Sequence, residues 1–397
     1  MRSIKELFPV CIIILAFSLL PLVDASEGDR LPDFAVCLQH CNTKFECEIP
    51  KFARRDDYDG GSKSARTEYA NTLEDALNRY ELNYIVRTLF GWDCLSNCKY
   101  KCVRYVTENR ISDGLRIVQF FGKWPFIRIW GITEFFSTIF SIANFYANYV
   151  NIGKIYFQYS KNKRDTTSSN GYHVMYFQYL TLLVISCVGW TFSTIFHIRD
   201  TPLTETLDYF GAIAIIMCNF NVIVIRYFKL YLPSSKPKLL LFQASLLVAY
   251  LFHVTKLLNF WDYVYNVKFN LFFGLSSLIL WILHSKNVQS VYLKNFHIYS
   301  NSIQLLPFET KILAKLDHLV IPLSKKPRLI PLLPIFLNGV LLFGISLEMI
   351  DFVPIYLLVD AHSLWHLVTI FPSLVWFDWN IWDMELMRLS SDINKFN

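Results

Sequence analysis

Five polar side chains lie inside or at the ends of long apolar stretches of the sequence, where polar groups are energetically costly. They are Ser193, His197, Asp208, His362 and His366. Ser193 and His197 are one helical turn apart, as are His362 and His366, so each pair would share one face of a helix. Three imidazoles with an open fourth position form one of the ligand sets of hydrolytic zinc sites. The five residues therefore raise the hypothesis of a zinc centre inside an apolar bundle.

The same residue types predict a hydrolytic reaction. His197, His362 and His366 would hold zinc as neutral imidazoles and leave a position for water, whose pKa the metal lowers toward neutrality. Asp208 would act as general base and then as general acid, and Ser193 would donate a hydrogen bond to the developing oxyanion. A serine nucleophile is the alternative within the enzyme class, but Ser193 and His197 share a helix and three histidines exceed what a triad needs.

Each of these residues also has an ordinary structural interpretation. A membrane histidine often forms an interhelical hydrogen bond, which is the role expected of His253. Asp208 alone could be a carboxylate favoured by the dipole at a helix start, and Ser193 alone could bond to its own helix. Glu134 is expected to be an interhelical partner or a support residue. Asp360 is the weaker candidate to support a histidine from outside the metal shell.

Composition indicates the kind of elements that must position these residues. The chain has 397 residues, of which 53% are hydrophobic and only 18% charged, which is less charge than soluble proteins carry. Several apolar runs reach the roughly 20 residues that span a bilayer, and tryptophans near their ends, such as Trp379 and Trp382, are interpreted as interfacial anchors. We therefore expect an all-α membrane protein with a seven-helix transmembrane bundle over residues 121–385. The expected helices are 127–150, 174–198, 206–228, 239–258, 264–284, 331–350 and 355–377.

The N-terminal part has the features of a secreted segment. Residues 1–25 combine a basic start, an apolar run and a small-x-small cleavage pattern, which predicts a cleaved signal peptide, with an uncleaved first helix as the alternative. A luminal cysteine-rich domain is expected over residues 26–120, with a flexible connection at 54–64. Clustered cysteines in a secreted stretch indicate a disulfide framework, whose pairing the sequence leaves open, and a zinc site is the competitor. The candidate cysteines are Cys37, Cys41, Cys47, Cys94, Cys98 and Cys102.

The charges between the apolar runs predict the orientation. Lysine and arginine gather in alternate loops, at 154–164, 226–238 and 286–328, and the positive-inside rule places these loops in the cytosol. The N-terminal domain is then luminal, and residues 386–397 form a short cytosolic tail. Three expected helices consequently bring their polar residues to the luminal edge of the membrane, where a site would meet lipid head groups. The net charge of +6 does not suggest nucleic acid, and membrane lipid is the expected partner.

Four segments carry a resemblance to a known family. They are CKYKC at 98–102, GKWPF at 122–126, FHIRDTPLTETLDYF at 196–210 and DAHSLWHL at 360–367. Through them the chain resembles the lipid remodellers that act after GPI attachment to proteins, the fungal Per-type processing proteins of the endoplasmic reticulum. These belong to a superfamily with alkaline ceramidases and progestin/adiponectin receptors. The resemblance covers residues 30–385.

The resemblance implies removal of the sn-2 acyl chain from the phosphatidylinositol part of GPI-anchored proteins, a phospholipase A2-type step. GPI-anchored proteins and their lipid moiety would then be the partners, in the endoplasmic reticulum membrane, with a Golgi or vacuolar membrane as the alternative. In the ceramidase branch, the positions matching Ser193, His197, Asp208, His362 and His366 form a zinc amidase site. Because the superfamily contains receptors, fold alone does not establish an enzyme. A non-enzymatic receptor or chaperone-like factor for GPI proteins and a ceramidase-like lipid amidase are the alternatives.

Overall fold

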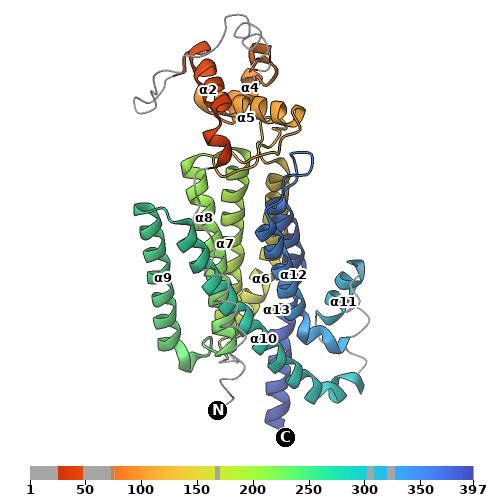
Figure 1. Ribbon diagram of the computed structural model, residues 1–397. Coiled ribbons are helices and arrows are strands. Elements are labelled where there is room, and N and C mark those ends of the chain that lie inside the picture. Colours follow the sequence, from red (N-terminus) through yellow and green to blue (C-terminus); the bar gives the residue numbers. More distant parts are fainter. Residues whose placement is uncertain are drawn as a thin grey trace, which may run out of the picture.

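The described structure is built from helices and contains no strand. The computed structural model describes residues 26–47, 73–75, 77–165, 170–301, 308–319 and 327–396, and at 295–301, 327 and 391–396 it describes the backbone alone. Across these residues the β-type pairs are isolated bridges. The expected all-α class is therefore confirmed (Figure 1). The predicted signal peptide and the predicted flexible connection lie outside the described residues.

The N-terminal part of the described chain forms a small helical unit, which we call the cysteine-rich region. Its helical elements are η3 (Glu27–Arg30), α2 (Pro32–Lys44), α4 (Tyr84–Leu89) and α5 (Cys94–Ser112). Side chains fix the starts of the last two helices. Asn83 accepts a hydrogen bond from the backbone N–H of Ile85, and Asp93 accepts one from the backbone N–H of Ser96, as is typical of N-caps.

Three disulfides join the α2 side of this region to α5. Cysteines one helical turn apart lie on the same face of a helix. Two antiparallel helices can therefore form successive disulfides along their contact. The pairs are Cys37–Cys102, Cys41–Cys98 and Cys47–Cys94. The predicted disulfide-rich region is therefore confirmed, and its bridges are nested.

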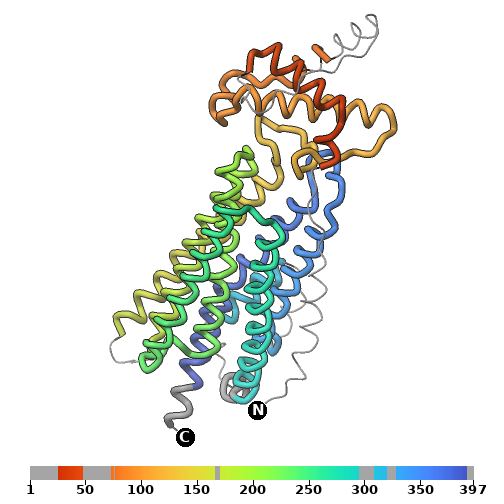
Figure 2. Tube along the Cα trace, turned by 60° about the vertical axis from the view of Figure 1, so that its left-hand side comes forward, coloured from red at the N-terminus to blue at the C-terminus, as the bar shows by residue number. Residues whose placement is uncertain are grey.

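Seven long helices follow the cysteine-rich region within the described residues and run side by side (Figures 1 and 2). They are α6 (Phe135–Arg164), α7 (Tyr172–Ile198), α8 (Pro202–Tyr227), α9 (Lys236–Asn259), α10 (Tyr263–Asn301), α12 (Leu333–Ile350) and α13 (Ala361–Phe396). α6 packs against α7 and α13, α7 against α8, and α12 against α13, while the short α11 (Glu309–His318) packs on α13. The cysteine-rich region lies at one end of this bundle, and α9 lies at its edge.

Five helical segments are long and apolar enough to cross a membrane. They comprise α7, α8, α9 with η5 (Pro233–Ser235), α10 as far as Lys294, and α12 with η7 (Pro327–Leu332). Several apolar spans of this kind characterise a polytopic membrane protein. The expected number of seven stays a prediction, because α6 and α13 are not among these five.

A polar stripe explains why α6 is less apolar than a lipid-facing helix. Positions spaced alternately by four and three residues share one face of a helix. The buried polar residues at this spacing are Ser137, Ser141, Asn144, Asn148, Asn151 and Gln158. Asn144 donates to the backbone carbonyl of His366 at 2.7 Å, and Asn151 donates to that of Ser373 at 3.1 Å. The stripe thus holds α6 against α13 by hydrogen bonds.

The first long helix begins later than expected. α6 starts at Phe135 rather than near residue 127, because a turn at Trp130 and Gly131, with φ angles of 51° and 82°, precedes it. Positive φ interrupts a right-handed helix. α10 and α13 instead extend beyond their expected ends, and α13 continues to Phe396 through the segment expected as a tail.

Two tryptophans expected as interfacial anchors are core residues. Trp379 and Trp382 are fully buried. Trp379 packs 5.9 Å from Trp281 of α10, between ring centroids, and Trp382 packs 5.6 Å from Tyr292 of the same helix. The indole N–H of Trp379 also donates to the carbonyl of Ile330. The anchor interpretation is wrong for these two residues, which join α13 to α10.

Candidate metal centre

α7 and α8 bring Ser193, His197 and Asp208 together because the two helices approach closely at a pair of glycines. Gly189 lies one turn before Ser193, and Gly211 lies about one turn after Asp208. A Cβ on Gly211 would lie only 3.0 Å from the Cα of Gly189, so larger residues would push the helices apart. Small residues at such crossings let membrane helices pack closely. The antiparallel pair therefore places its polar residues at the same level.

α12 and α13 form a second antiparallel pair that also depends on a glycine. A Cβ on Gly344 would lie 2.5 Å from the ring of Trp365. α13 begins with a reciprocal cap, in which the Ser363 N–H donates to the Asp360 carboxylate at 2.8 Å and the Asp360 N–H donates to the Ser363 hydroxyl at 3.1 Å. Asp360 therefore caps α13. The hydrogen bond to a histidine that we expected from Asp360 comes instead from Glu348, which contacts His362.

The structure brings the three predicted histidines together. The ring centroids of His197, His362 and His366 are 4.5, 4.9 and 5.2 Å apart. The Nε2 atoms of His362 and His366 are 3.0 Å apart, and one nitrogen of each ring lies within 4.8 Å of the others. His197 and His366 are buried, and His362 is partly buried. We call this group the histidine cluster.

Two carboxylates hold the outer nitrogens of the histidine cluster. Nδ1 of His197 lies 2.7 Å from Oε2 of Glu134, the residue that precedes α6. Nδ1 of His362 lies 3.0 Å from both carboxylate oxygens of Glu348, near the end of α12. A carboxylate accepts a hydrogen bond, so each of these rings carries its proton on Nδ1 and directs the lone pair of Nε2 to the other side.

A hydroxyl has the corresponding role for His366. Nδ1 of this ring lies 2.9 Å from the Oγ of Ser141 on α6. The Ser141 hydroxyl donates its own proton to the carbonyl of Ser137 at 2.8 Å. Ser141 therefore accepts from His366, which also carries its ring proton on Nδ1. All three rings consequently present an Nε2 lone pair toward one another.

The centre of the histidine cluster has the electrostatic character of a cation site. The Nε2 of His197 is buried and has no hydrogen-bond partner, and the other two Nε2 atoms face one another. Buried acceptors are unfavourable unless a donor or a cation satisfies them. Three histidine nitrogens, each ring with a hydrogen-bond partner on its outer side, are the donor set and support typical of zinc. The residues present therefore fit a zinc ion.

Ser193 and Asp208 lie beside the histidine cluster. The Oγ of Ser193 is 3.3 Å from the Oγ of Ser141, the partner of His366. The carboxylate of Asp208 is within hydrogen-bonding reach of the Ser193 hydroxyl and interacts electrostatically with His197. The structure thus brings all five predicted site residues into one group that three helices position.

Glu348 and Ser141 are site residues that sequence reasoning did not single out. A signal for Glu348 exists, because it and His362 lie at the facing ends of two helices joined by a short loop. Ser141 offers no such signal, since a serine in an apolar helix most often bonds to its own backbone. Glu134 has the support contact expected of it. His253 packs against Phe269 of α10, with ring centroids 4.1 Å apart, but both of its ring nitrogens are buried without a hydrogen-bond partner among the described residues, so the interhelical hydrogen bond expected of it is not observed.

Lys123 holds Glu134 from the side of the cysteine-rich region. Its Nζ lies 2.9 Å from Oε1 of Glu134 and 3.0 Å from Oδ2 of Asp200, and it lies 4.0 Å from the ring centroid of Phe196. Burial alone would lower the pKa of Lys123, but the two carboxylates outweigh burial and raise this pKa above its usual value. Lys123 therefore stays charged and compensates the carboxylate that holds His197.

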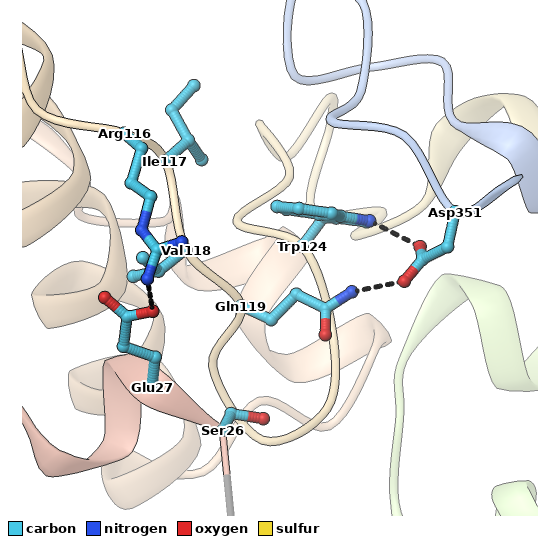
Figure 3. A pocket seen from close by; sticks show the side chains of 8 residues that line it. All are labelled: Ser26, Glu27, Arg116, Ile117, Val118, Gln119, Trp124 and Asp351. Carbon is cyan, nitrogen blue, oxygen red and sulfur yellow. Dashed lines mark hydrogen bonds and ion pairs between the residues drawn. The ribbon is translucent and has the colours of Figure 1, made fainter. Parts of the chain in front are cut away.

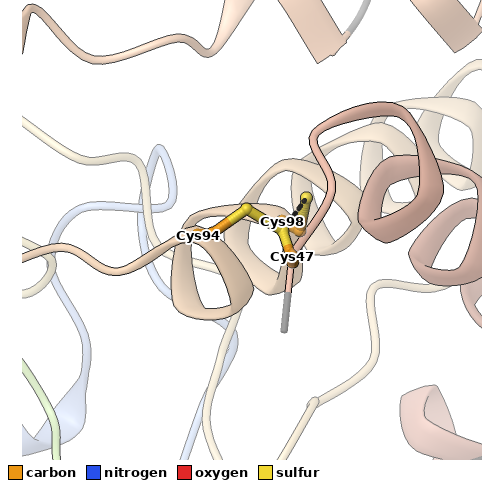
Figure 4. A group of neighbouring side chains, drawn as sticks. All are labelled: Cys47, Cys94 and Cys98. Carbon is orange, nitrogen blue, oxygen red and sulfur yellow. Dashed lines mark hydrogen bonds between the residues drawn. A yellow bond between two sulfur atoms is a disulfide. The ribbon is translucent and has the colours of Figure 1, made fainter. Parts of the chain in front are cut away.

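Three cysteine sulfurs in the cysteine-rich region also lie close together, as Figure 4 shows. They belong to Cys47, Cys94 and Cys98. Cys47 is bonded to Cys94, and Cys98 is bonded to Cys41. A metal binds the thiolate form of cysteine, which a disulfide does not offer. Disulfides therefore account for this group, and the competing zinc interpretation of the cysteines is not supported.

Comparisons with known proteins match most of the chain. The profile of the Per1-like family matches residues 85–384, which include the histidine cluster, Ser193 and Asp208. The chain belongs to the Per1-like family. Among the relatives of this Per1-like chain is "Protein PER1" of Saccharomyces cerevisiae, which is 32% identical over 362 residues, or 91% of this chain and 93% of that protein.

Further relatives of the Per1-like chain have names that mention a lipid. One is "GPI-specific phospholipase A2-like PGAP3" of Homo sapiens, 27% identical over 378 residues, which are 94% of each chain. "Post-GPI attachment to proteins factor 3" of Drosophila melanogaster is 27% identical over 359 residues, or 90% of this chain and 89% of that protein. No solved structure matches the chain.

Proposed function

We propose that this chain hydrolyses the sn-2 acyl ester in the phosphatidylinositol part of GPI-anchored proteins, as a zinc-dependent phospholipase A2-type enzyme of GPI-anchor remodelling. The names of its relatives support a role in the processing of GPI anchors. The observation that carries the reaction is the convergence of three imidazole Nε2 atoms beside the carboxylate of Asp208 and the hydroxyl of Ser193. Such a group combines metal ligands, a general base and an oxyanion donor.

We place the reaction at the luminal edge of the endoplasmic reticulum membrane. Disulfides persist in oxidising compartments, which supports a luminal position for the cysteine-rich region. The basic loops support a cytosolic position for the opposite end of the bundle. The histidine cluster lies toward the cysteine-rich end, because Lys123 and Glu134 link it to that side. A site at this depth meets the ester groups of membrane lipids rather than their chain ends.

The chain's own side chains would divide the reaction between them. Zinc held by His197, His362 and His366 would supply Lewis-acid activation of water and of the ester carbonyl. Asp208 takes a proton from the attacking water as the new C–O bond forms. Ser193 donates a hydrogen bond to the oxyanion of the tetrahedral intermediate. The C–O bond to glycerol then breaks, Asp208 returns the proton to the glycerol oxygen, and a fatty acid and a lysolipid leave.

Substitution of Asp208 tests this function directly. The purified protein in lipid nanodiscs is supplied with a GPI-anchored protein, and released fatty acid is measured by mass spectrometry. We expect Asp208→Asn to lower kcat by about 10²–10⁴-fold, the usual contribution of general acid–base catalysis, while the zinc content is unchanged. Glu205→Gln, a carboxylate substitution one turn earlier on α8, is the matched control and should keep its activity. A wild-type rate for Asp208→Asn would contradict the proposal.

The same assay separates the alternatives. A receptor or chaperone-like factor would bind GPI-anchored proteins and release no fatty acid from them. A ceramidase-like amidase would release fatty acid from ceramide in preference to the GPI lipid. We expect one equivalent of zinc per chain by plasma mass spectrometry, together with the lysolipid form of the anchor as product.

A further inference from the structure

An open cleft lies between the cysteine-rich region and the loop from α12 to α13, and nothing in the reaction above uses it. Its volume is about 260 Å³. Figure 3 shows the side chains that line it, of which the informative ones are Ser26, Glu27, Arg116, Gln119, Trp124 and Asp351. Pockets for drug-sized ligands measure roughly 300–1,000 Å³, so this cleft is near the lower end of that range.

An ion pair lines one side of the cleft, and a carboxylate lines the other. On one side Arg116 pairs with Glu27, and 77% of the Arg116 side chain is exposed. On the other side Asp351 accepts hydrogen bonds from the indole N–H of Trp124 at 2.7 Å and from the amide of Gln119 at 2.9 Å. Asp351 has a positive φ of 41°, which non-glycine residues rarely adopt. The two hydrogen bonds hold its carboxylate in a specific place.

These side chains have the chemistry of a site for a charged oligosaccharide. A guanidinium binds phosphate oxygens through paired N–H donors. Carboxylates accept hydrogen bonds from ammonium and hydroxyl groups, and an indole face attracts cations and packs against apolar sugar faces. A ligand that carries both phosphate and amine groups on a sugar would engage Arg116, Asp351 and Trp124 at the same time.

The cleft is connected to both carboxylates that hold the histidine cluster. Trp124 follows Lys123, which pairs with Glu134, the partner of His197. Asp351 follows the end of α12, one turn after Glu348. The cleft and the histidine cluster are therefore joined through neighbouring residues on two sides.

We propose that this cleft binds the phosphate- and amine-bearing glycan of the GPI anchor while the lipid part lies at the histidine cluster. The inference rests on the proposed function and names the part of the substrate that gives it specificity. Free phosphatidylinositol has the same ester but no glycan. The cleft therefore makes the enzyme prefer anchored proteins over bulk phospholipid.

Two matched substrates test the cleft. One is a GPI glycolipid, and the other is the phosphatidylinositol left after nitrous acid deamination removes its glycan. For Arg116→Gln we expect about a tenfold lower kcat/KM on the glycolipid, arising from KM, which corresponds to roughly 1.4 kcal/mol, and no change on phosphatidylinositol. Arg79→Gln is the control, since Arg79 is an exposed arginine of the same region that pairs with Glu108. Equal effects of Arg116→Gln on both substrates, or no effect on either, would overturn the inference.

A binding measurement keeps this test separate from the proposed reaction. The probe is the water-soluble glycan phosphoinositol obtained by alkaline deacylation of the glycolipid, titrated into the full chain in nanodiscs. We expect saturable binding that Arg116→Gln weakens about tenfold, even if the wild type hydrolyses no lipid and the proposed function fails. Equal affinity in the variant, or displacement by inorganic phosphate at equal concentration, would refute a glycan site while the hydrolase could still stand.

Discussion

Two buried polar clusters lie about 25 Å apart along α13, and they are completed in opposite ways. The arginine cluster comprises Arg226, His284 and Asp383. Arg226 donates to both oxygens of Asp383, at 2.7 and 2.9 Å, and Nε2 of His284 lies 3.1 Å from Oδ2. In the histidine cluster, by contrast, three acceptor nitrogens face one another, and that of His197 has no partner. The polar atoms of the arginine cluster are paired within the protein, whereas the Nε2 of His197 is not.

The difference shows how a buried polar group can be assigned to structure or to ligand binding. A bidentate arginine–carboxylate pair uses the donors and acceptors of both residues, so such a cluster needs nothing further and joins α8, α10 and α13. Acceptors gathered without a donor are unfavourable by themselves, so they persist where a cation completes them. The predictions that follow test this contrast, from the largest expected effect to the smallest.

Loss of a histidine should have opposite consequences in the two clusters. We expect His366→Ala to lose its zinc and to lower the rate of fatty acid release by about a thousandfold or more, because a zinc site with two histidines is incomplete. His284→Ala should keep one zinc per folded chain. Zinc is measured by plasma mass spectrometry and activity with the GPI-anchored substrate. A stoichiometric zinc content in His366→Ala would show that the histidine cluster is not the metal site.

Removing the charge of Asp383 from the arginine cluster should lower the stability of the fold. Asp383→Ala leaves the guanidinium of Arg226 buried without its partner, and removing one member of a buried pair destabilises by about 3–5 kcal/mol. We expect a large decrease in Tm in detergent, with an unchanged zinc content of the protein that remains folded. A variant that is fully stable but has lost zinc would instead couple the two clusters.

Loss of an outer carboxylate should weaken zinc binding without abolishing it. In Glu134→Gln the amide can still accept from Nδ1 of His197, but the charge that makes the ring a better ligand is gone. Such substitutions lower metal affinity by about 10–100-fold. Competition with a chelator of known affinity measures the change. Glu385→Gln, a buried carboxylate farther along α13 that pairs with Arg388, is the control and should leave the zinc affinity unaltered.

A methyl group at the crossing of α12 and α13 should have the smallest effect. Gly344→Ala would place a Cβ 2.5 Å from the ring of Trp365, and overpacking of this kind destabilises by about 1–3 kcal/mol. We expect a lower Tm and a moderately slower reaction, because Glu348 and His362 lie about one turn beyond this contact. Gly339→Ala on the same helix has open space around its Cβ. If both variants lose equal stability, the contact with Trp365 does not set the crossing.

The five predicted site residues were accessible to sequence reasoning for a physical reason. Polar residues in apolar stretches stand out against their surroundings, and the alternation of basic loops predicts which of them share a membrane face. Two of their partners, Glu348 and Ser141, do not stand out in this way. Glu348 lies in the last turn of the helix expected over residues 331–350, close to Asp351, where a carboxylate indicates only a polar helix end, and Ser141 is one of several serines in α6.

The elements that set the geometry were the hardest to predict. Hydropathy identified the apolar helices, but their crossings depend on contacts of Gly189, Gly211 and Gly344 that no periodicity marks. α6 could be expected as a helix, yet its polar stripe has meaning only beside the backbone of α13. The burial of Trp379 shows the same limitation. A tryptophan near the end of an apolar stretch can lie at the membrane–water interface or in the protein core, and the sequence does not distinguish the two.

The nested disulfides have a consequence for the order in which the chain is assembled. Their partners are 47, 57 and 65 residues apart in the sequence, and the innermost pair is Cys47–Cys94. A chain that enters the lumen from its N-terminus exposes Cys94 before Cys98 and Cys102, so the inner bridge can close as soon as its second half emerges. Each bridge shortens the loop that the next must close. Under the proposed luminal position, the three bridges can therefore form from the innermost outward before the long helices that follow them have been synthesised.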